Sequence, residues 1–89
     1  MSVRGEFRRL GGDLLTALRD GDPQRGRGEA AVLAQLIERA ERDLTGAAED
    51  ALVLLGRLDA VSLADAPQRR RFDDAYERLE AVCRIILGR

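Results

Sequence analysis

Apolar residues recur along the chain at alternating spacings of three and four, which places them on one face of an α-helix. The first such stripe runs from Val3 to Ala17 and predicts a helix over residues 3–20. It stops just before Gly21 and Pro23. Glycine accepts the left-handed conformation that often follows a last helical turn, and proline cannot continue a helix, so both residues support this end point.

Two glycines lie inside this first predicted helix. Gly11 and Gly12 each cost about 1 kcal/mol relative to alanine in a helix interior. They either weaken the helix or allow another helix to approach it closely. The segment that follows, residues 21–28, contains three glycines, one proline and no large apolar residue, and therefore predicts a loop.

The second stripe is the longest one and keeps its phase from Ala30 to Val61. Gly46 could mark a break after Thr45, but the spacing of three and four continues through it without a slip. We therefore expect one helix over residues 29–60, roughly 48 Å long at 1.5 Å per residue. Written as a heptad, its a and d rows are Ala30, Leu33, Ile37, Ala40, Leu44, Ala47, Ala51, Leu54, Leu58 and Val61.

A third stripe, from Phe72 to Ile86, predicts a helix over residues 66–87. The connections between the three predicted helices are short enough to place neighbours antiparallel. The expected fold is an all-α, antiparallel three-helix bundle with a long central helix, forming a single domain over residues 1–89.

The second half of the predicted central helix is apolar on more than one side. Leu52, Val53 and Leu55 add apolar surface outside the a and d rows, and one covering helix cannot bury all of it. We therefore expect a homodimer with these three residues at its interface. The alternative is a monomeric three-helix bundle whose first helix folds over Leu52 and Val53.

The composition narrows the chemistry that the chain can perform. It has 89 residues, a formal net charge of −1, no histidine and one cysteine, Cys83. Without a histidine base or paired cysteines, conventional nucleophilic catalysis and zinc or haem sites are not expected, and no cofactor is predicted. The longest apolar runs are five residues long, too short to span a membrane, and we expect a cytoplasmic protein.

Acidic pairs offer the one route to an enzyme. Glu38 and Glu41 lie on the second predicted helix, and Glu77 and Glu80 on the third. All-α nucleotide pyrophosphohydrolases hold magnesium with acidic pairs on two facing helices, so an enzyme of that type is the first alternative. When each helix is written as a heptad, Glu38 is at b on the second helix and Glu77 is at f on the third. Side chains at b and f point away from the bundle, which favours solvated surface charge.

A run of three arginines, Arg69, Arg70 and Arg71, lies at the start of the third predicted helix. Such a run could contact phosphates, so an accessory nucleic-acid-binding protein is the second alternative. Asp65, Asp73 and Asp74 flank the run and reduce its positive field, so we do not favour nucleic acid as the partner. The sequence favours a small non-enzymatic interaction module, an adaptor, chaperone-like or regulatory protein, which acts through helix packing, self-association and contact with a protein partner.

Overall fold

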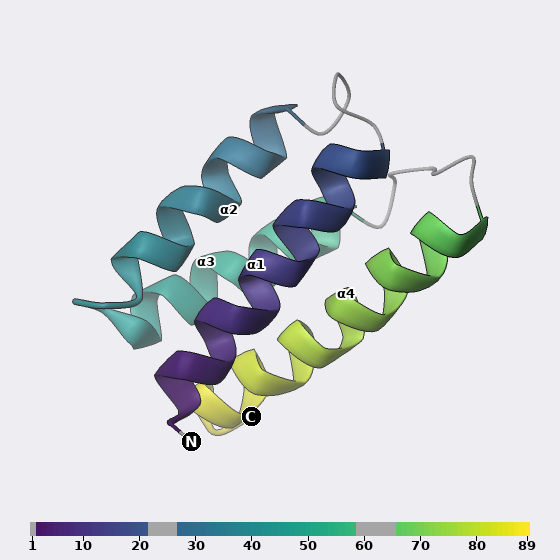
Figure 1. The fold of residues 1–89 in the computed structure, drawn as a ribbon. Helices are drawn as coiled ribbons and strands as arrows, with labels where there is room; N and C mark the ends of the chain where they lie inside the picture. The colour runs from purple at the N-terminus through teal and green to yellow at the C-terminus, as the bar shows by residue number, and fades with distance from the viewer. Residues whose placement is uncertain (1, 22–26, 59–65) are drawn as a thin grey trace.

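The computed structural model describes residues 2–21, 27–58 and 66–89, and every regular element within them is an α-helix. The helices alternate in direction along the chain and form an antiparallel four-helix bundle (Figure 1). The all-helical prediction is therefore confirmed for these residues. The four helices are α1 (Val3–Gly21), α2 (Arg27–Arg39), α3 (Leu44–Leu58) and α4 (Ala66–Leu87).

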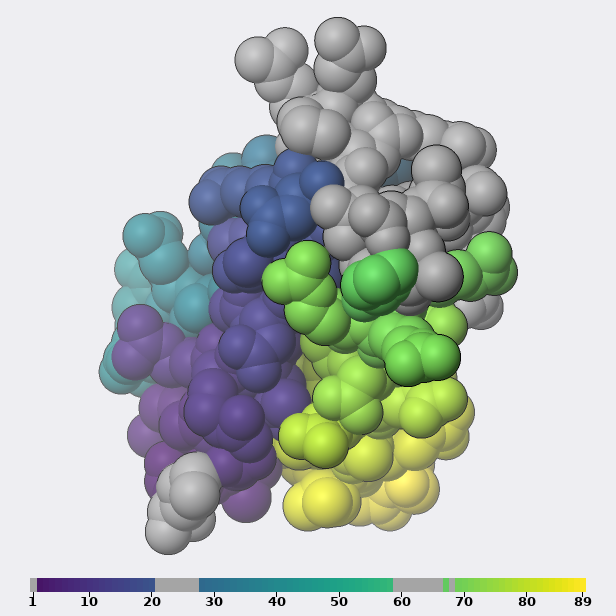
Figure 2. Space-filling model, turned by 45° about the vertical axis from the view of Figure 1, so that its right-hand side comes forward, coloured from purple at the N-terminus to yellow at the C-terminus, as the bar shows by residue number. Residues whose placement is uncertain are grey.

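Each helix packs against two others, so the bundle is a closed ring of four seams. α1 contacts α2 and α4, and α3 contacts the same two helices from the other side. α1 and α4 lie side by side along one face of the molecule (Figure 2). The side chains that meet inside the ring are apolar, and none of the described polar or charged residues is buried. The largest fully buried side chains are Phe7, Leu14, Leu18, Leu33, Leu55, Leu58, Leu79 and Cys83.

The prediction of one long central helix over residues 29–60 is wrong, and the three-helix bundle with it. The chain forms two helices here, α2 and α3, which fold back on one another at residues 40–43. Both halves of the apolar stripe still face the core: Leu33 and Ala40 are buried in the first half, and Ala47 and Leu54 in the second. The turn preserves the spacing of the stripe, so the spacing could not reveal it.

Asp43 begins α3 as its N-cap residue. Its carboxylate Oδ1 accepts a hydrogen bond of 2.9 Å from the backbone N–H of Gly46, three residues on, which would otherwise lack an intrahelical partner. This bond and the guanidinium of Arg39 lower the pKa of Asp43. A Cβ at Gly46 would lie 2.8 Å from the Asp43 Cγ and even nearer the Asp43 Oδ2 and the Arg39 Nη2. A side chain at this position would therefore displace the ends of both the capping carboxylate and the guanidinium.

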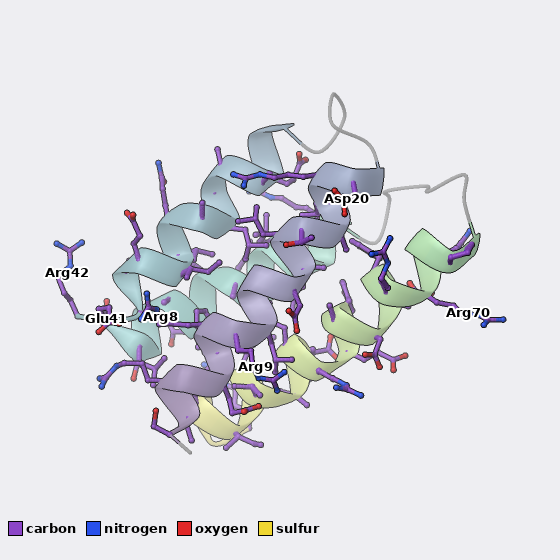
Figure 3. The ribbon with its side chains drawn as sticks, viewed as in Figure 1. Arg8, Arg9, Asp20, Glu41, Arg42 and Arg70 are labelled. Atoms are coloured by element: carbon purple, nitrogen blue, oxygen red, sulfur yellow. The ribbon has the colours of Figure 1, made fainter. Side chains whose placement is uncertain are left out.

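The first turns of α1 hold the α2–α3 turn in place. Arg4 Nε donates a hydrogen bond of 3.0 Å to the backbone carbonyl of Ala40. One turn further along α1, the guanidinium of Arg8 pairs with the carboxylate of Glu41 (Figure 3). Both contacts join residues more than 30 positions apart, so they fix α1 to the turn that the sequence pattern did not predict.

Gly11 marks the close approach of α1 to α2. It is buried, and a Cβ at this position would lie 3.0 Å from Cγ1 of Ile37. Gly12, its neighbour, has open space where a side chain would stand. Of the two interpretations offered for these glycines, the close approach of another helix is correct for Gly11.

α4 ends in a glycine turn. Gly88 has a φ of 70°, a left-handed conformation that glycine adopts without strain. The N–H of Gly88 bonds to the carbonyl of Ile85 and that of Arg89 to the carbonyl of Arg84, the pair of bonds that defines a Schellman motif. The loop predicted at residues 21–28 and the connection between the second and third predicted helices lie largely outside the described residues.

Candidate interaction surface

The three predicted interface residues of α3 occupy different environments. Leu55 is 1% exposed and belongs to the core of the single chain, and Leu52 is half-buried against that core. Val53 alone points outward, with 60% of its surface exposed. The apolar surface on several sides of α3 is largely covered by α2 and α4 of the same chain, which leaves Val53 as the apolar side chain of this helix that faces solvent.

Val53 borders a groove between α2 and α3. The groove has a volume of about 340 Å³ and combines residues of both helices. Leu36 and Leu54 form its apolar floor, while Val32 and Val53 stand above it, 41% and 60% exposed. We call this the α2–α3 face, and its residues are Val32, Gln35, Leu36, Arg39, Asp50, Val53, Leu54 and Arg57.

An ion pair closes the α2–α3 face at the end nearest the turn. Arg39 Nη1 donates a hydrogen bond of 2.5 Å to Asp50 Oδ2, and Arg39 Nη2 lies 3.1 Å from Asp43 Oδ2. These bonds, first to Asp50 and then to Asp43, raise the pKa of the Arg39 guanidinium. Arg57 lines the same face one turn beyond Val53. Along α3, the face therefore carries Asp50, which is paired with Arg39, before Val53 and the basic Arg57 after it.

The arginine run on α4 is exposed, and its three members point to different surroundings. Arg69 and Arg70 lie at the surface of the first turns of α4, and Arg70 extends away from the bundle (Figure 3). Arg71 borders a second groove, about 320 Å³ in volume, between α1 and α4. Asp13 of α1 and Asp74 of α4 line this groove together with Arg71 and Arg78, so its carboxylates balance its guanidinium groups.

The acidic pairs proposed for a magnesium site are not brought together. Glu38 lies on α2 and Glu41 in the turn after it, whereas Glu77 and Glu80 lie on α4, the helix diagonally opposite α2. Glu41 pairs with Arg8, and Glu80 lies 3.9 Å from Arg84. Over residues 2–21, 27–58 and 66–89, no group of three or more acidic or cysteine side chains has the arrangement of a metal site.

Cys83, the one thiol of the chain, is a core residue. Its side chain is fully buried on α4. Burial, together with the negative charge of nearby Glu80, raises the pKa of the thiol to about 12. The thiol is therefore protonated at neutral pH, and the thiolate form that attacks electrophiles or binds metals is suppressed.

Comparisons with known protein families, with curated proteins and with solved structures give no match to this chain. None of the helices, as far as the structure describes them, has the length and apolar character needed to cross a membrane. The candidate site therefore rests on the geometry of the α2–α3 face.

The sequence pattern predicted Val53 as an interface residue, and the structure places it on the α2–α3 face; the residues that α2 contributes were not predicted. The available signal for Val32 was that it is an apolar residue outside the a and d rows. Arg39 and Asp50 were not recognised as partners because a continuous helix would hold them far apart. Only the fold-back of α2 on α3 assembles the face.

Proposed function

We propose that this protein is a small non-enzymatic interaction module that self-associates through the α2–α3 face. The observation that carries the proposal is the exposure of Val53 and Val32 above an apolar floor, between charged groups of opposite sign. Burying apolar surface is favourable, and an apolar centre with a polar rim is the usual composition of a protein–protein interface.

The charges of α3 support a second copy of the chain as the partner. Asp50 precedes Val53 by three residues and Arg57 follows it by four, so the two lie about 4.5 Å and 6 Å from Val53 along the helix axis. When two α3 helices pack antiparallel about Val53, Asp50 of each copy lies opposite Arg57 of the other. A surface that complements itself in this way fits a two-fold dimer.

The size of the face indicates a weak dimer. α2 and α3 are about 20 Å long, and two adjacent helices present a width of about 20 Å. A contact of this size covers about 400 Å² on each copy, which is below the area typical of stable complexes. We therefore expect a dissociation constant in the micromolar range, suited to an exchangeable adaptor or regulatory contact.

Sedimentation of the wild type and of Val53→Glu tests this proposal. The wild type should dimerise at tens of micromolar, and Val53→Glu should remain monomeric because two carboxylates would meet at the centre of the contact. Ile85→Glu is the matched control, since Ile85 is 68% exposed on α4 and lies outside the face. A wild type that stays monomeric at these concentrations contradicts the proposal.

A mixing experiment tests the predicted pairing of charges. Asp50→Arg and Arg57→Asp each place like charges opposite one another in a homodimer and should weaken it. Mixed together, the two variants restore both opposite-charge pairs, so a heterodimer should form where neither variant associates alone. The absence of a heterodimer would contradict the antiparallel arrangement about Val53.

A further inference from the structure

The turn between α2 and α3 preserves the helical phase of the chain. The apolar spacing alternates between three and four from Ala30 to Leu58, through residues 40–43, and both halves of the stripe face the core. If the turn straightened, residues 27–58 would therefore form one amphipathic helix whose apolar side is continuous.

The backbone of the turn is already close to helical. Ala40 N–H bonds to the carbonyl of Leu36 at 3.0 Å, and Asp43 N–H to that of Arg39 at 2.8 Å, both across four residues as in an α-helix. Glu41 and Arg42 bond across three residues instead. Gly88 is the one described residue with a positive φ, so residues 40–43 contain no left-handed conformation that would oppose straightening.

The residues of the turn also favour a helix. Ala40, Glu41 and Arg42 are strong helix formers, and no glycine or proline lies between Arg39 and Asp43. What holds the turn closed is the Asp43 cap together with contacts at the surface: the pair of Arg39 with Asp50, the pair of Arg8 with Glu41, and the Arg4 hydrogen bond. Exposed ion pairs contribute little individually.

We propose that the turn at residues 40–43 is a hinge through which two copies of the chain exchange halves. With α2 and α3 joined as one helix, the α1–α2 half of each copy packs against the α3–α4 half of the other. The seams between α1 and α4 and between α2 and α3 then join two chains and bury the same apolar residues as before. Domain exchange of this kind needs no new complementary surface.

The charges around Arg39 are compatible with both arrangements. Arg39 and Asp43 are four residues apart, a spacing that also allows an ion pair within a continuous helix. The Arg39–Asp50 pair forms within one chain in the folded-back form and between two chains in the exchanged form. The exchange is independent of the α2–α3 face, because Val53 remains on the outside in both arrangements.

Cross-linking across the α1–α4 seam distinguishes the two forms, because this seam joins two chains in the exchanged dimer and lies outside the α2–α3 face. In an Asp13→Cys/Arg78→Cys/Cys83→Ala variant, with both new cysteines at the groove between α1 and α4, a short bifunctional maleimide should link two chains covalently in the exchanged dimer. It should link one chain to itself in the monomer, and also in a dimer formed through the α2–α3 face. Refolding at high protein concentration, followed by separation of the dimer, supplies the sample.

Substitutions in the turn should shift the equilibrium in opposite directions. Gly46→Ala crowds the Asp43 cap, which only the folded-back form uses, whereas position 46 is helical in both forms. Weakening the cap at the two turns replaced in each dimer should raise the dimerisation constant by on the order of 30-fold. Gly12→Ala is the matched control, because it strengthens a helix without touching the turn. Thr45→Pro is tolerated in the first turn of α3 and breaks a continuous helix, so it should abolish the exchanged dimer.

The proposal is supported if the dimer of Gly46→Ala, carrying the two cysteines, gives cross-links between chains and persists with Val53→Glu. It is overturned if concentrated, refolded Gly46→Ala gives only cross-links within one chain. A dimer that has only such internal cross-links and disappears with Val53→Glu would overturn the exchange while supporting self-association through the α2–α3 face.

Discussion

Arg39 and Asp50 are eleven residues apart in the sequence, yet the Arg39 guanidinium donates a hydrogen bond of 2.5 Å to the Asp50 carboxylate. In a continuous helix, eleven residues would separate the two Cα atoms by roughly 16 Å along the axis, which is too far for direct contact within one chain. The pair therefore reports the fold-back of α2 on α3. Both side chains are about half exposed, so the ion pair is a consequence of this fold-back and contributes little to its stability.

Replacing Arg39 with glutamine should lower the melting temperature only modestly, because the lost ion pairs lie at the surface. Surface ion pairs are screened by salt, so the difference between wild type and variant should shrink when the sodium chloride concentration is raised from 0.05 M to about 1 M. Thermal unfolding followed by circular dichroism checks this. A large difference that persists at high salt would show that Arg39 acts through packing of its aliphatic part.

Acidification should weaken the α2–α3 turn through Asp43. Its pKa is lowered in the fold by the Gly46 N–H and by Arg39. A lowered pKa means that the carboxylate contributes stability above its ordinary pKa, near 3.9, and that this contribution is lost as pH falls through the folded value. Asp43→Asn keeps an acceptor for the cap and removes the charge. The wild type should therefore be the more stable at pH 7, and the difference should disappear in strong acid.

The control for this pH dependence is Asp73→Asn. Asp73 is exposed on α4 and makes no ion pair among the described residues. Its substitution should leave the melting temperature nearly constant at both pH values. If Asp73→Asn and Asp43→Asn gave the same acid profile, the capping interaction would not be the origin of the effect.

Gly11→Ala and Gly12→Ala form a matched pair that measures the approach of α1 to α2. Both replace a glycine inside one helix and should gain about 1 kcal/mol of helix propensity. At Gly12 the new methyl group meets open space, so the gain should appear in full. At Gly11 it meets Ile37, and we expect that variant to be less stable than Gly12→Ala by about 1–2 kcal/mol in urea unfolding. Equal stabilities would mean that Ile37 moves aside without cost.

Cys83 should report unfolding without disturbing the fold. Because the buried thiol has a pKa of about 12, a disulfide-exchange reagent at pH 8 should react slowly with the native protein and rapidly in denaturant. The raised pKa also predicts how stability depends on pH. The contribution of Cys83 to the stability of the fold is fully present below the ordinary thiol pKa and is lost as pH rises toward 12. Fast labelling of the native protein would contradict this burial.

α1 and α4 show what the sequence pattern can predict. The expected helices at residues 3–20 and 66–87 correspond to Val3–Gly21 and Ala66–Leu87. Both have one uninterrupted stripe, and α1 ends at Gly21, two residues before Pro23, which cannot continue a helix. Where the periodicity and the stop signals coincide, local chemistry determines the helix and its bounds.

The turn at residues 40–43 shows where the pattern fails. Ala40 and Leu44 are four residues apart, which fits one stripe whether the chain continues as a helix or folds back. The local signal for a new helix was present in Asp43 and Gly46, an N-cap residue and a glycine in the first turn. It was outweighed by the regular spacing, because spacing reports which side is apolar and carries no information on chain direction.

The candidate site could be predicted only in part for the same reason. Val53 was predicted at an interface because it is apolar and lies off the main stripe, and the structure leaves it exposed in the single chain. Leu55 has the same signature and is buried, since the structure places a covering helix on that side. Which side of α3 meets α2 or α4 depends on the fold-back, and that is a property of the tertiary structure.

The closed ring of four helices has a consequence for how the chain folds. Three of its seams join helices that follow one another in sequence, and only the α1–α4 seam joins the two ends of the chain. Contacts between sequence neighbours form quickly, whereas closing a loop across most of the chain carries an entropic cost before any contact offsets it. The α1–α4 seam is therefore the step that should set the folding rate, and core substitutions on these two helices should slow folding more than equivalent ones in the α2–α3 hairpin.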